Sequence, residues 1–248
     1  MSTTSKIEWT ERTWNPVVGC TKLSAGCKHC YAETMAKRLR AIGVRGYEEG
    51  FKVIRTLPFR LEEPLNRKQP TVYFVNSMSD LFHVDVPESF IDRVFDVMAN
   101  CPQHTFQVLT KRAERLAEYS LERIVPDNVW VGVSVENKRH GVPRIAHLQA
   151  AKAKIKFLSV EPLLEDVGVL HLSGVSWVIV GGESGHGARR MKSEWVRNVQ
   201  RQCDSQGVNF FFKQWGAHGS DGLRRTKKAN GRLFDGATWD AMPVISAR

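Results

Sequence analysis

The sequence predicts an α/β fold, and three observations support this prediction. Short runs of β-branched and aromatic residues recur along the chain, and segments of helical periodicity separate most of them. Continuous apolar runs suit strands that are buried on both faces of a parallel sheet. About seven strand–helix units fit into the 248 residues, and (β/α) barrels usually have about 250 residues. We therefore expect a single partial or closed (β/α) barrel, with a doubly wound open sheet as the alternative.

The strands are predicted from runs that carry few charges and end in polar turns. The first strand is expected around residues 14–18, directly before a loop with three cysteines. The six later strands are expected at residues 71–77, 104–110, 128–136, 154–161, 176–184 and 209–215. Because helices alternate with them, these strands should be parallel and joined by right-handed crossovers.

The helices are predicted from apolar stripes and from their end signals. A first helix should follow the cysteine loop. Residues 87–100 begin with Pro and Glu, as first turns of helices prefer, and place an apolar stripe on one face. Further helices are expected at residues 111–120, 136–151 and 191–207, and the last of these ends on Gly207, a suitable helix cap.

The domain organisation follows from where this alternation stops. Residues 1–216 are expected to form the barrel, with an insertion near residues 41–69 between the first helix and the second strand. Residues 217–248 are rich in glycine and in basic side chains. We expect this tail to be an irregular segment that wraps around the barrel or covers it as a lid.

The charge of the chain indicates an anionic partner. The formal net charge is +10 and the pI is near 9.6. From His186 to the end, twelve Lys or Arg residues stand against five Asp or Glu residues. A basic surface concentrates polyanions, above all nucleic acids. We therefore expect a nucleic acid or a nucleotide-like substrate, with a solvated basic face as the alternative.

The compartment is predicted from what the sequence lacks. No segment approaches the roughly 20 apolar residues that span a bilayer, and the N-terminal stretch has no apolar core of a signal peptide. A cytoplasmic protein without a membrane contact is expected. In that compartment, clustered thiols serve metal binding or redox chemistry in preference to disulfides.

Three of the five cysteines lie in one short segment. Cys20, Cys27 and Cys30 are separated by six and by two residues. Thiolates are soft ligands for Zn²⁺, Cu(I) and iron–sulfur clusters, and a structural zinc site takes four protein ligands. Three ligands leave one position open, which favours an iron–sulfur cluster and keeps zinc as the alternative. Cys101 and Cys203 are expected to be small buried hydrophobic residues.

A resemblance sharpens this prediction. The segments that carry it are "IEWTERTWNPVVGCTKLSAGCKHCYAE", "NSMSDLFH", "VSVEN", "SVEPLLE", "IVGGESG" and "FFKQWG". They make the chain similar to the phage- and prophage-associated three-Cys-motif proteins. That group resembles the radical S-adenosylmethionine superfamily and, distantly, its spore photoproduct lyase branch, which repairs DNA lesions.

The resemblance implies a barrel of the TIM-like radical S-adenosylmethionine type and a 4Fe-4S cluster on Cys20, Cys27 and Cys30. The open iron would bind S-adenosylmethionine. An external donor of the flavodoxin or ferredoxin type would supply one electron, and cleavage of a carbon–sulfur bond would give a 5′-deoxyadenosyl radical. The implied activity is modification or repair of a nucleic acid or nucleotide-like substrate.

The sequence departs from the superfamily pattern in two places. The first cysteine gap has six residues, where the superfamily usually has three. The Gly-Gly-Glu element, which normally follows the second strand, here follows the sixth apolar run as Gly181, Gly182 and Glu183. We therefore do not assign these residues the superfamily role.

The remaining site residues are predicted from the ends of the strands, because ligands bind at the carboxyl ends of parallel strands. Ser134 and Glu136 match the position at which superfamily members hold the ribose hydroxyls. Glu161 suits either a pocket or a salt bridge. The residues expected to bind the cofactor are Asn76, Ser77, Ser79, Lys111, Ser134, Glu136 and Glu161.

The last strands supply the groups expected to act on the substrate. Glu183 and Lys213 are predicted to be catalytic; a helix cap and a surface lysine beside a packed tryptophan are their alternatives. Gly181, Gly182 and Gln214 are predicted to contact the substrate. The rival function is a zinc-containing nucleic-acid-binding phage accessory protein without catalysis. The sequence also leaves open a partner protein that completes the site.

Overall fold

The computed structural model describes residues 3–5 and 7–244. Residues 1–2 and 245–248, at the ends of the predicted barrel and tail, lie outside the described residues, as does residue 6. The chain divides into two compact units. The first consists of Met1–Leu23, Cys30–Val131 and Ala151–Lys154, and the second of Ser24–His29, Gly132–Ala150 and Ile155–Arg248. The predicted division after residue 216 stays a prediction.

The first unit contains a sheet in which successive strands pair side by side. β1 (Thr3–Thr4) is antiparallel to β2 (Arg12–Trp14). β2 is parallel to β5 (Val72–Val75), and β5 is parallel to β6 (Thr105–Thr110). All but one residue of β6 are buried, as expected for an inner strand.

The predicted first strand is divided in two. Trp14 ends β2, whereas β3 (Val17–Val18) pairs antiparallel with β4 (Arg55–Thr56) in a separate two-stranded sheet. The chain leaves β2 at Asn15 and Pro16, and proline has no N–H group for a sheet ladder. The second half of the predicted strand, Val17–Val18, therefore pairs with β4, which lies in the predicted insertion.

The helices of the first unit are α1 (Tyr31–Ala41), α2 (Glu62–Leu65), α3 (Glu88–Ala99) and α4 (Ala113–Glu122), together with the 3-10 turn η2 (Pro58–Arg60). α3 was expected, and its apolar stripe is buried as predicted. In the core, the rings of Tyr73 and Phe106 stack with centroids 5.4 Å apart, and Trp14 lies 5.7 Å from Phe106. These contacts join β2, β5 and β6.

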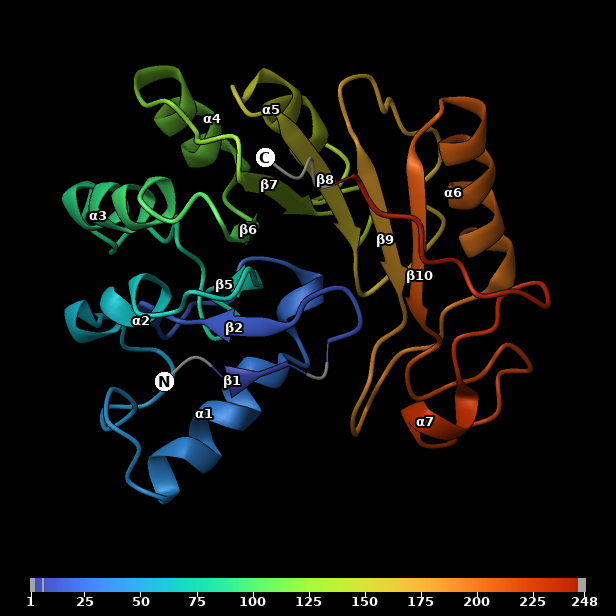
Figure 1. Cartoon of the computed structure of the whole chain (residues 1–248). Coiled ribbons are helices and arrows are strands. Elements are labelled where there is room, and N and C mark those ends of the chain that lie inside the picture. Colours follow the sequence, from blue (N-terminus) through green and yellow to red (C-terminus); the bar gives the residue numbers. More distant parts are fainter. Residues whose placement is uncertain (1–2, 6, 245–248) are drawn as a thin grey trace. The chain divides into compact units, whose positions relative to one another are not determined.

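The second unit contains three parallel strands. They are β8 (Ile155–Val160), β9 (Trp177–Gly181) and β10 (Asn209–Gln214). Its helical segments are η1 (Ala25–Cys27), α5 (Arg144–Ala150), α6 (Ser193–Ser205) and α7 (Lys227–Asn230). α6 packs beside β10 (Figure 1). β7 (Val129–Ser134), with all six residues buried, belongs partly to each unit.

α5 is shorter than predicted, because turns occupy the first half of the expected helix. The N–H groups of Gly141 and Val142 donate to the carbonyl of Asn137, and α5 begins only after Pro143. A Cβ on Gly141 would lie 2.6 Å from Cα of Val135. This close packing of the turn requires glycine.

The tail packs against β10 within the second unit. The N–H group of Phe212 donates to the carbonyl of Trp239 over 2.8 Å, and Phe211 bridges to Asp240. The ring of Phe234 lies 5.5 Å from that of Phe212. Apart from α7, the described tail has no long regular element, as the sequence predicts.

The strand order of the main sheet is β1-β2-β5-β6-β7-β8-β9-β10. From β2 onward, this order follows the chain without a reversal, whereas a doubly wound sheet reverses at a switch point. The α/β class and the partial-barrel arrangement of seven parallel strands, from β2 to β10, are therefore confirmed. No helix among the described residues is both long enough and apolar enough to cross a membrane.

Candidate functional site

The cysteine segment begins in the first unit, where the backbone around Gly19 is closely packed. Gly19 has a φ of +85°, and a Cβ there would lie 2.1 Å from the carbonyl oxygen of Val53. The N–H group of Cys20 donates to the carbonyl of Phe51 over 2.8 Å. Cys30 directly precedes α1 and packs against a small buried cluster around Met78. Both thiols are half-buried.

A guanidinium group faces the sulfur of Cys20. Arg112 Nη1 lies 3.9 Å from Cys20 Sγ and 2.9 Å from Asp80 Oδ2, and its Nη2 donates to Thr21 Oγ1 over 3.2 Å. Burial lowers the pKa of Arg112, but the charges of Asp80 and Cys20 outweigh it and the pKa is raised. The sulfur therefore meets a permanent cation, which favours the thiolate, the form that binds metals.

Asp80 binds Arg112 through a carboxylate whose two oxygens each accept two hydrogen bonds. Its Oδ1 accepts from Thr110 Oγ1 over 2.6 Å and from the N–H of Phe82 over 3.1 Å. Its Oδ2 accepts from Arg112 and from the N–H of Lys111 over 3.1 Å. The main chain of Lys111 thus supports this carboxylate, and the predicted role of its side chain stays a prediction.

His83 secures the residue next to Cys20. Its Nδ1 accepts from the N–H of Asp85 over 3.2 Å, so its Nε2 carries the hydrogen and donates to Thr21 Oγ1 over 2.7 Å. Burial, followed by the charge of Arg112, lowers the pKa of His83. The imidazole is therefore neutral at physiological pH, as this donor arrangement requires.

The end of β5 carries three of the predicted cofactor residues, and all three lie near the segment that precedes Cys20. Asn76 has a φ of +59°, a conformation that asparagine tolerates, and its Oδ1 accepts from the N–H of Val17 over 3.1 Å. Its buried Nδ2 has no hydrogen-bond partner within residues 3–5 and 7–244. Ser79 Oγ donates to the carbonyl of Val17 over 2.8 Å.

Ser77 lies between the start of the chain and α1. Its Oγ is 3.1 Å from Asn15 Oδ1, and its carbonyl accepts from the hydroxyl of Tyr31 over 2.5 Å. Tyr31 itself is 58% exposed.

In the second unit, residues 24–29 of the cysteine segment lie against Glu136. Ser24 Oγ is 3.9 Å from Cys27 Sγ, and Cys27 is half-buried. A Cβ on Gly26 would lie 3.1 Å from the Cγ of Glu136. Glycine at this position thus allows the segment to approach the carboxylate closely.

Glu136 and Ser134 share one arginine. Arg144 Nη1 lies 2.7 Å from Glu136 Oε2 and donates to the carbonyl of Ser134 over 2.7 Å. All three residues are buried. The structure brings the two predicted ribose-binding residues together and adds Arg144, which the sequence analysis missed. Their contact with a ribose stays a prediction.

Glu183 forms a two-pronged ion pair with Arg189. The Oε1 of Glu183 lies 2.6 Å from Nη2 of Arg189, and its Oε2 accepts from Nε and from the backbone N–H, each over 2.8 Å. Burial raises the pKa of Glu183, but the hydrogen bonds and charge of Arg189 outweigh it, so the pKa is lowered. Arg189 Nη2 also donates to the carbonyl of Ala25 over 3.0 Å, which ties the cysteine segment to this pair.

Glu161 and Lys213 form a second ion pair, with Nζ 3.1 Å from Oε1. Glu161 Oε2 accepts from Ser159 Oγ over 3.2 Å. A Cβ on Gly181 would lie 2.4 Å from Glu161 Oε1. Of the two roles considered for Glu161, the salt bridge is observed; cofactor binding by Glu161 and catalysis by Lys213 stay predictions.

Gly182 and Gln214 are engaged with the protein itself. A Cβ on Gly182 would lie 1.9 Å from the carbonyl oxygen of Trp215, which gives this glycine a packing reason. Gln214 Nε2 donates to the carbonyl of Gly182 over 3.2 Å and to Ser184 Oγ over 3.0 Å. The predicted substrate contacts of Gly181, Gly182 and Gln214 stay predictions.

The other two cysteines differ from the three in the segment. Cys101 and Cys203 are almost completely buried, as the sequence predicts. Burial raises the pKa of both thiols, that of Cys203 to about 12. Both therefore remain protonated at neutral pH and are poor metal ligands.

Among the described residues, no group of three or more His, Cys, Asp or Glu side chains is gathered closely enough to hold a metal ion. Cys20 and Cys30 belong to the first unit and Cys27 to the second. Sequence reasoning also missed Arg144 and Arg189. A signal for them existed, since a buried carboxylate requires a cation, and they follow Glu136 by eight and Glu183 by six residues.

Residues 4–243 match a family described as protein of unknown function, DUF5131. The chain belongs to this family. No match was found among curated proteins.

Solved structures of spore photoproduct lyase are similar to the chain. One is complexed with dinucleoside spore photoproduct, at 14% identity and a TM-score of 0.44. Another is a mutant with bound AdoMet and dinucleoside spore photoproduct, at 14% identity and a TM-score of 0.48. The similarity covers 82% of this chain and 63% of each of those chains. The chain thus spans less than two thirds of their length.

Proposed function

We propose that the chain is a radical S-adenosylmethionine enzyme of the three-Cys-motif group, which is associated with phages and prophages. It would act in the cytoplasm on a nucleic acid or nucleotide-like substrate. Cys20, Cys27 and Cys30 would hold a 4Fe-4S cluster through three thiolates. The observation that carries the proposal is the cysteine segment itself, in which a permanent cation, Arg112, faces the sulfur of Cys20.

The donor set fits such a cluster. Iron–sulfur clusters take soft thiolate ligands, and the three thiols of the segment are half-buried. The two thiols outside it, Cys101 and Cys203, are buried and have raised pKa values. The chain therefore separates its cysteines into accessible and inaccessible groups, and only the accessible group follows the motif.

When bound, the cluster would pass one electron from an external flavodoxin- or ferredoxin-type donor to S-adenosylmethionine, which yields methionine and a 5′-deoxyadenosyl radical. The chain's own residues would bind and orient the cofactor. Asn76 would offer its buried amide N–H group, and Ser77 and Ser79 their hydroxyls, to the methionine moiety. Lys111 and Glu161 would bind its charged groups, and Ser134 and Glu136 the ribose.

Glu183 and Lys213 would act on the substrate side. Because its pKa is lowered by Arg189, Glu183 is ionised at neutral pH and would serve as an acceptor of hydrogen bonds. It has no proton to donate. Lys213, which is paired with Glu161, would attract an anionic substrate. The net charge of +10 supports a nucleic acid as the substrate class.

The test begins with protein purified without oxygen. We expect about four iron and four sulfide per chain, and release of 5′-deoxyadenosine when S-adenosylmethionine and a reductant are added. Cys20→Ala, Cys27→Ala and Cys30→Ala should each lose the iron. Cys101→Ala, a matched control outside the segment, should keep it.

Two results would refute the proposal. The first is one zinc per chain without iron, which the rival accessory-protein function predicts. The second is iron that depends equally on Cys101 and on the three cysteines of the segment. An iron-loaded protein that leaves S-adenosylmethionine intact would remove the enzymatic activity and leave only a cluster-binding protein.

A further inference from the structure

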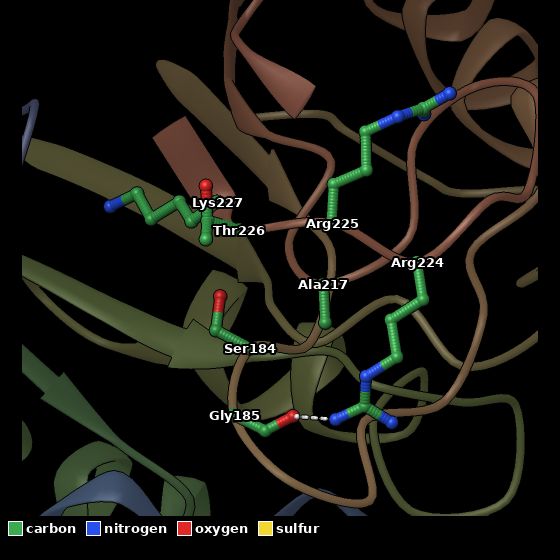
Figure 2. A pocket seen from close by; sticks show the side chains of 7 residues that line it. All are labelled: Ser184, Gly185, Ala217, Arg224, Arg225, Thr226 and Lys227. Atoms are coloured by element: carbon green, nitrogen blue, oxygen red, sulfur yellow. Dashed lines mark hydrogen bonds between the residues drawn. The ribbon is translucent and has the colours of Figure 1, made fainter. Parts of the chain in front are cut away.

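A pocket of about 450 Å³ lies in the second unit, between the loop after β9 and the tail. Its lining residues are Ser184, Gly185, Ala217, Arg224, Arg225, Thr226 and Lys227. Figure 2 shows Ser184 and Gly185 on one segment facing the tail residues on the other, with Ala217 between them. Three of the seven lining residues are cations and none is a carboxylate.

The two walls of the pocket are fixed by backbone hydrogen bonds. The N–H of Ala217 donates to the carbonyl of Glu183 over 2.9 Å, and the N–H of Arg225 donates to the carbonyl of Ala217 over 3.0 Å. Gly216 allows this close approach, since a Cβ there would lie 2.2 Å from the oxygen of Glu183. The cations are therefore presented by a connected framework.

The two arginines that line the pocket, Arg224 and Arg225, differ in whether a carboxylate is paired with their charge. Arg225 forms a two-pronged ion pair with Asp221, at 2.6 and 2.9 Å, and these hydrogen bonds lower the pKa of Asp221 to about 2. Arg224 donates to the neutral carbonyl of Gly185 over 3.3 Å, drawn as a dashed line in Figure 2. In residues 3–5 and 7–244, no carboxylate lies within ion-pair distance of Arg224. Its charge is therefore available to a ligand.

The hydroxyl groups of Ser184 and Thr226 can also donate hydrogen bonds to a ligand. Ser184 Oγ accepts from Gln214 Nε2 over 3.0 Å, and Thr226 Oγ1 accepts from the N–H of Ala229 over 3.2 Å. Each hydroxyl that accepts from the protein keeps its own hydrogen for another acceptor. A Cβ on Gly185, whose φ is +96°, would meet no atom within 4 Å. The backbone there is therefore open to a ligand.

A pocket that offers guanidinium, ammonium and hydroxyl hydrogens is suited to a phosphate group. We propose that this pocket binds one nucleotide unit of a nucleic acid strand through its backbone phosphate. The volume falls in the range of small-ligand sites, about 300–1,000 Å³, and exceeds what a phosphate alone requires. The exposed Arg224 and Lys227 leave the pocket open, so that a strand can continue on either side. The choice of a nucleic acid as the carrier of the phosphate rests on the proposed function.

The experiment measures binding of a fluorescent single-stranded oligonucleotide by anisotropy at several salt concentrations. Arg224→Gln and Lys227→Gln should each weaken binding about tenfold. Each should also reduce the slope of log K against log salt by about 0.7, the value for one phosphate contact to a single strand. Lys228→Gln is the matched control, since Lys228 lies on the same short helix α7 but does not line the pocket. It should change binding less than twofold.

Two further arms identify the group that is bound. An oligonucleotide of the same sequence with neutral methylphosphonate linkages should bind wild type and Arg224→Gln equally. Adenosine monophosphate should compete only weakly. If it displaces the strand at micromolar concentration, the pocket serves a free nucleotide and the proposal is wrong. Arg224→Lys, which keeps the charge, should restore the salt slope and so exclude misfolding as the cause.

This experiment separates the pocket from the proposed function, because binding is measured both with iron-loaded and with iron-free protein. If the protein binds no iron, but Arg224→Gln weakens its affinity for the oligonucleotide, the pocket proposal is supported and the proposed enzymatic function is refuted. If the protein cleaves S-adenosylmethionine, but wild type, Arg224→Gln and Lys228→Gln bind the oligonucleotide with equal affinity, the proposed enzymatic function is supported and the pocket proposal is refuted.

Discussion

The Asp80–Arg112 pair of the first unit and the Glu183–Arg189 pair of the second are built from the same chemistry. Each carboxylate is buried and follows a strand. Each arginine reaches past its carboxylate to one part of the cysteine segment. Arg112 reaches the sulfur of Cys20 at 3.9 Å, whereas Arg189 donates to the carbonyl of Ala25 at 3.0 Å.

The difference lies in what each arginine can influence. A cation beside a sulfur stabilises the thiolate, the form of cysteine that binds metals. A cation bound to a carbonyl fixes only the backbone. The carboxylates also differ, since that of Asp80 has three donors besides Arg112, whereas the hydrogen bonds found for the carboxylate of Glu183 all come from Arg189. We therefore infer a chemical role for Arg112 and a structural role for Arg189.

The largest effect is expected from Arg189→Met. It leaves the carboxylate of Glu183 buried with only one backbone donor, and removal of one partner of a buried pair costs about 3 kcal/mol or more. Urea unfolding measures this loss in the free energy of unfolding. Arg201→Met, on the exposed part of α6, is the control and should stay within about 0.5 kcal/mol of wild type. Equal stability of the two variants would contradict the structural role.

Arg112→Met should affect the proposed iron–sulfur cluster more than the stability of the fold. Removal of a group that supports a ligand typically weakens metal affinity about ten- to a hundredfold. The measurement is the amount of iron that a chelator takes from the anaerobically purified protein. Arg112→Lys should retain part of the iron, since it keeps the charge. If Arg189→Met loses iron while Arg112→Met retains it, the two roles are exchanged.

Thr110→Val tests how firmly Asp80 is held. The variant removes the 2.6 Å hydrogen bond to Asp80 Oδ1, and a hydrogen bond to a charged group contributes about 1.5–3 kcal/mol. We expect a loss near 1.5 kcal/mol in thermal or urea unfolding, because Asp80 keeps its other donors. Thr105→Val, a buried threonine on the same strand β6, is the matched control. A loss no larger than that of the control would show that Thr110 is not needed to hold Asp80.

The smallest effect is expected from protonation of Glu183, because burial and the hydrogen bonds from Arg189 shift its pKa in opposite directions. The net pKa is below the ordinary 4.5. The pair therefore contributes stability above about pH 4.5, and this contribution is lost as the pH falls through the folded-state pKa. Melting temperatures of wild type and Glu183→Gln should converge on acidification. Parallel curves down to pH 3 would show that Glu183 is not held ionised by Arg189.

Much of the fold could be predicted because strands and helices leave local signals. All six later strands lie within the predicted ranges, and α3 lies within residues 87–100. One prediction failed where a distant segment pairs with the strand, and another failed where local turns replace part of a helix. Val17–Val18 pairs with β4, which is 37 residues away in the register of Val18 and Arg55. Turns around Asn137 replace the first half of the helix predicted at residues 136–151. No local pattern reveals the pairing with β4.

The site was predictable to a smaller extent. The motif predicts Cys20, Cys27 and Cys30 as ligands, and the strand ends predict roles for Glu136, Glu161 and Glu183; these roles stay predictions. The arginines that bind these carboxylates were not found, because an arginine on a helix or loop has the same sequence pattern whether it faces solvent or a buried partner. The basic pocket shows the same limit: the charge of the tail was visible, but not which of its cations line a cavity.

The sequence by itself determined the alternation of strands and helices, the three-cysteine segment and the excess of positive charge. These properties depend on residue type and spacing, which act over a few positions. Only the tertiary structure decided that Arg112 faces a sulfur, that Arg189 faces a carbonyl, and that Arg224 has no carboxylate partner among the described residues. The partners of a charge are chosen by how the chain packs, because burial penalises every charge that folding leaves unmatched.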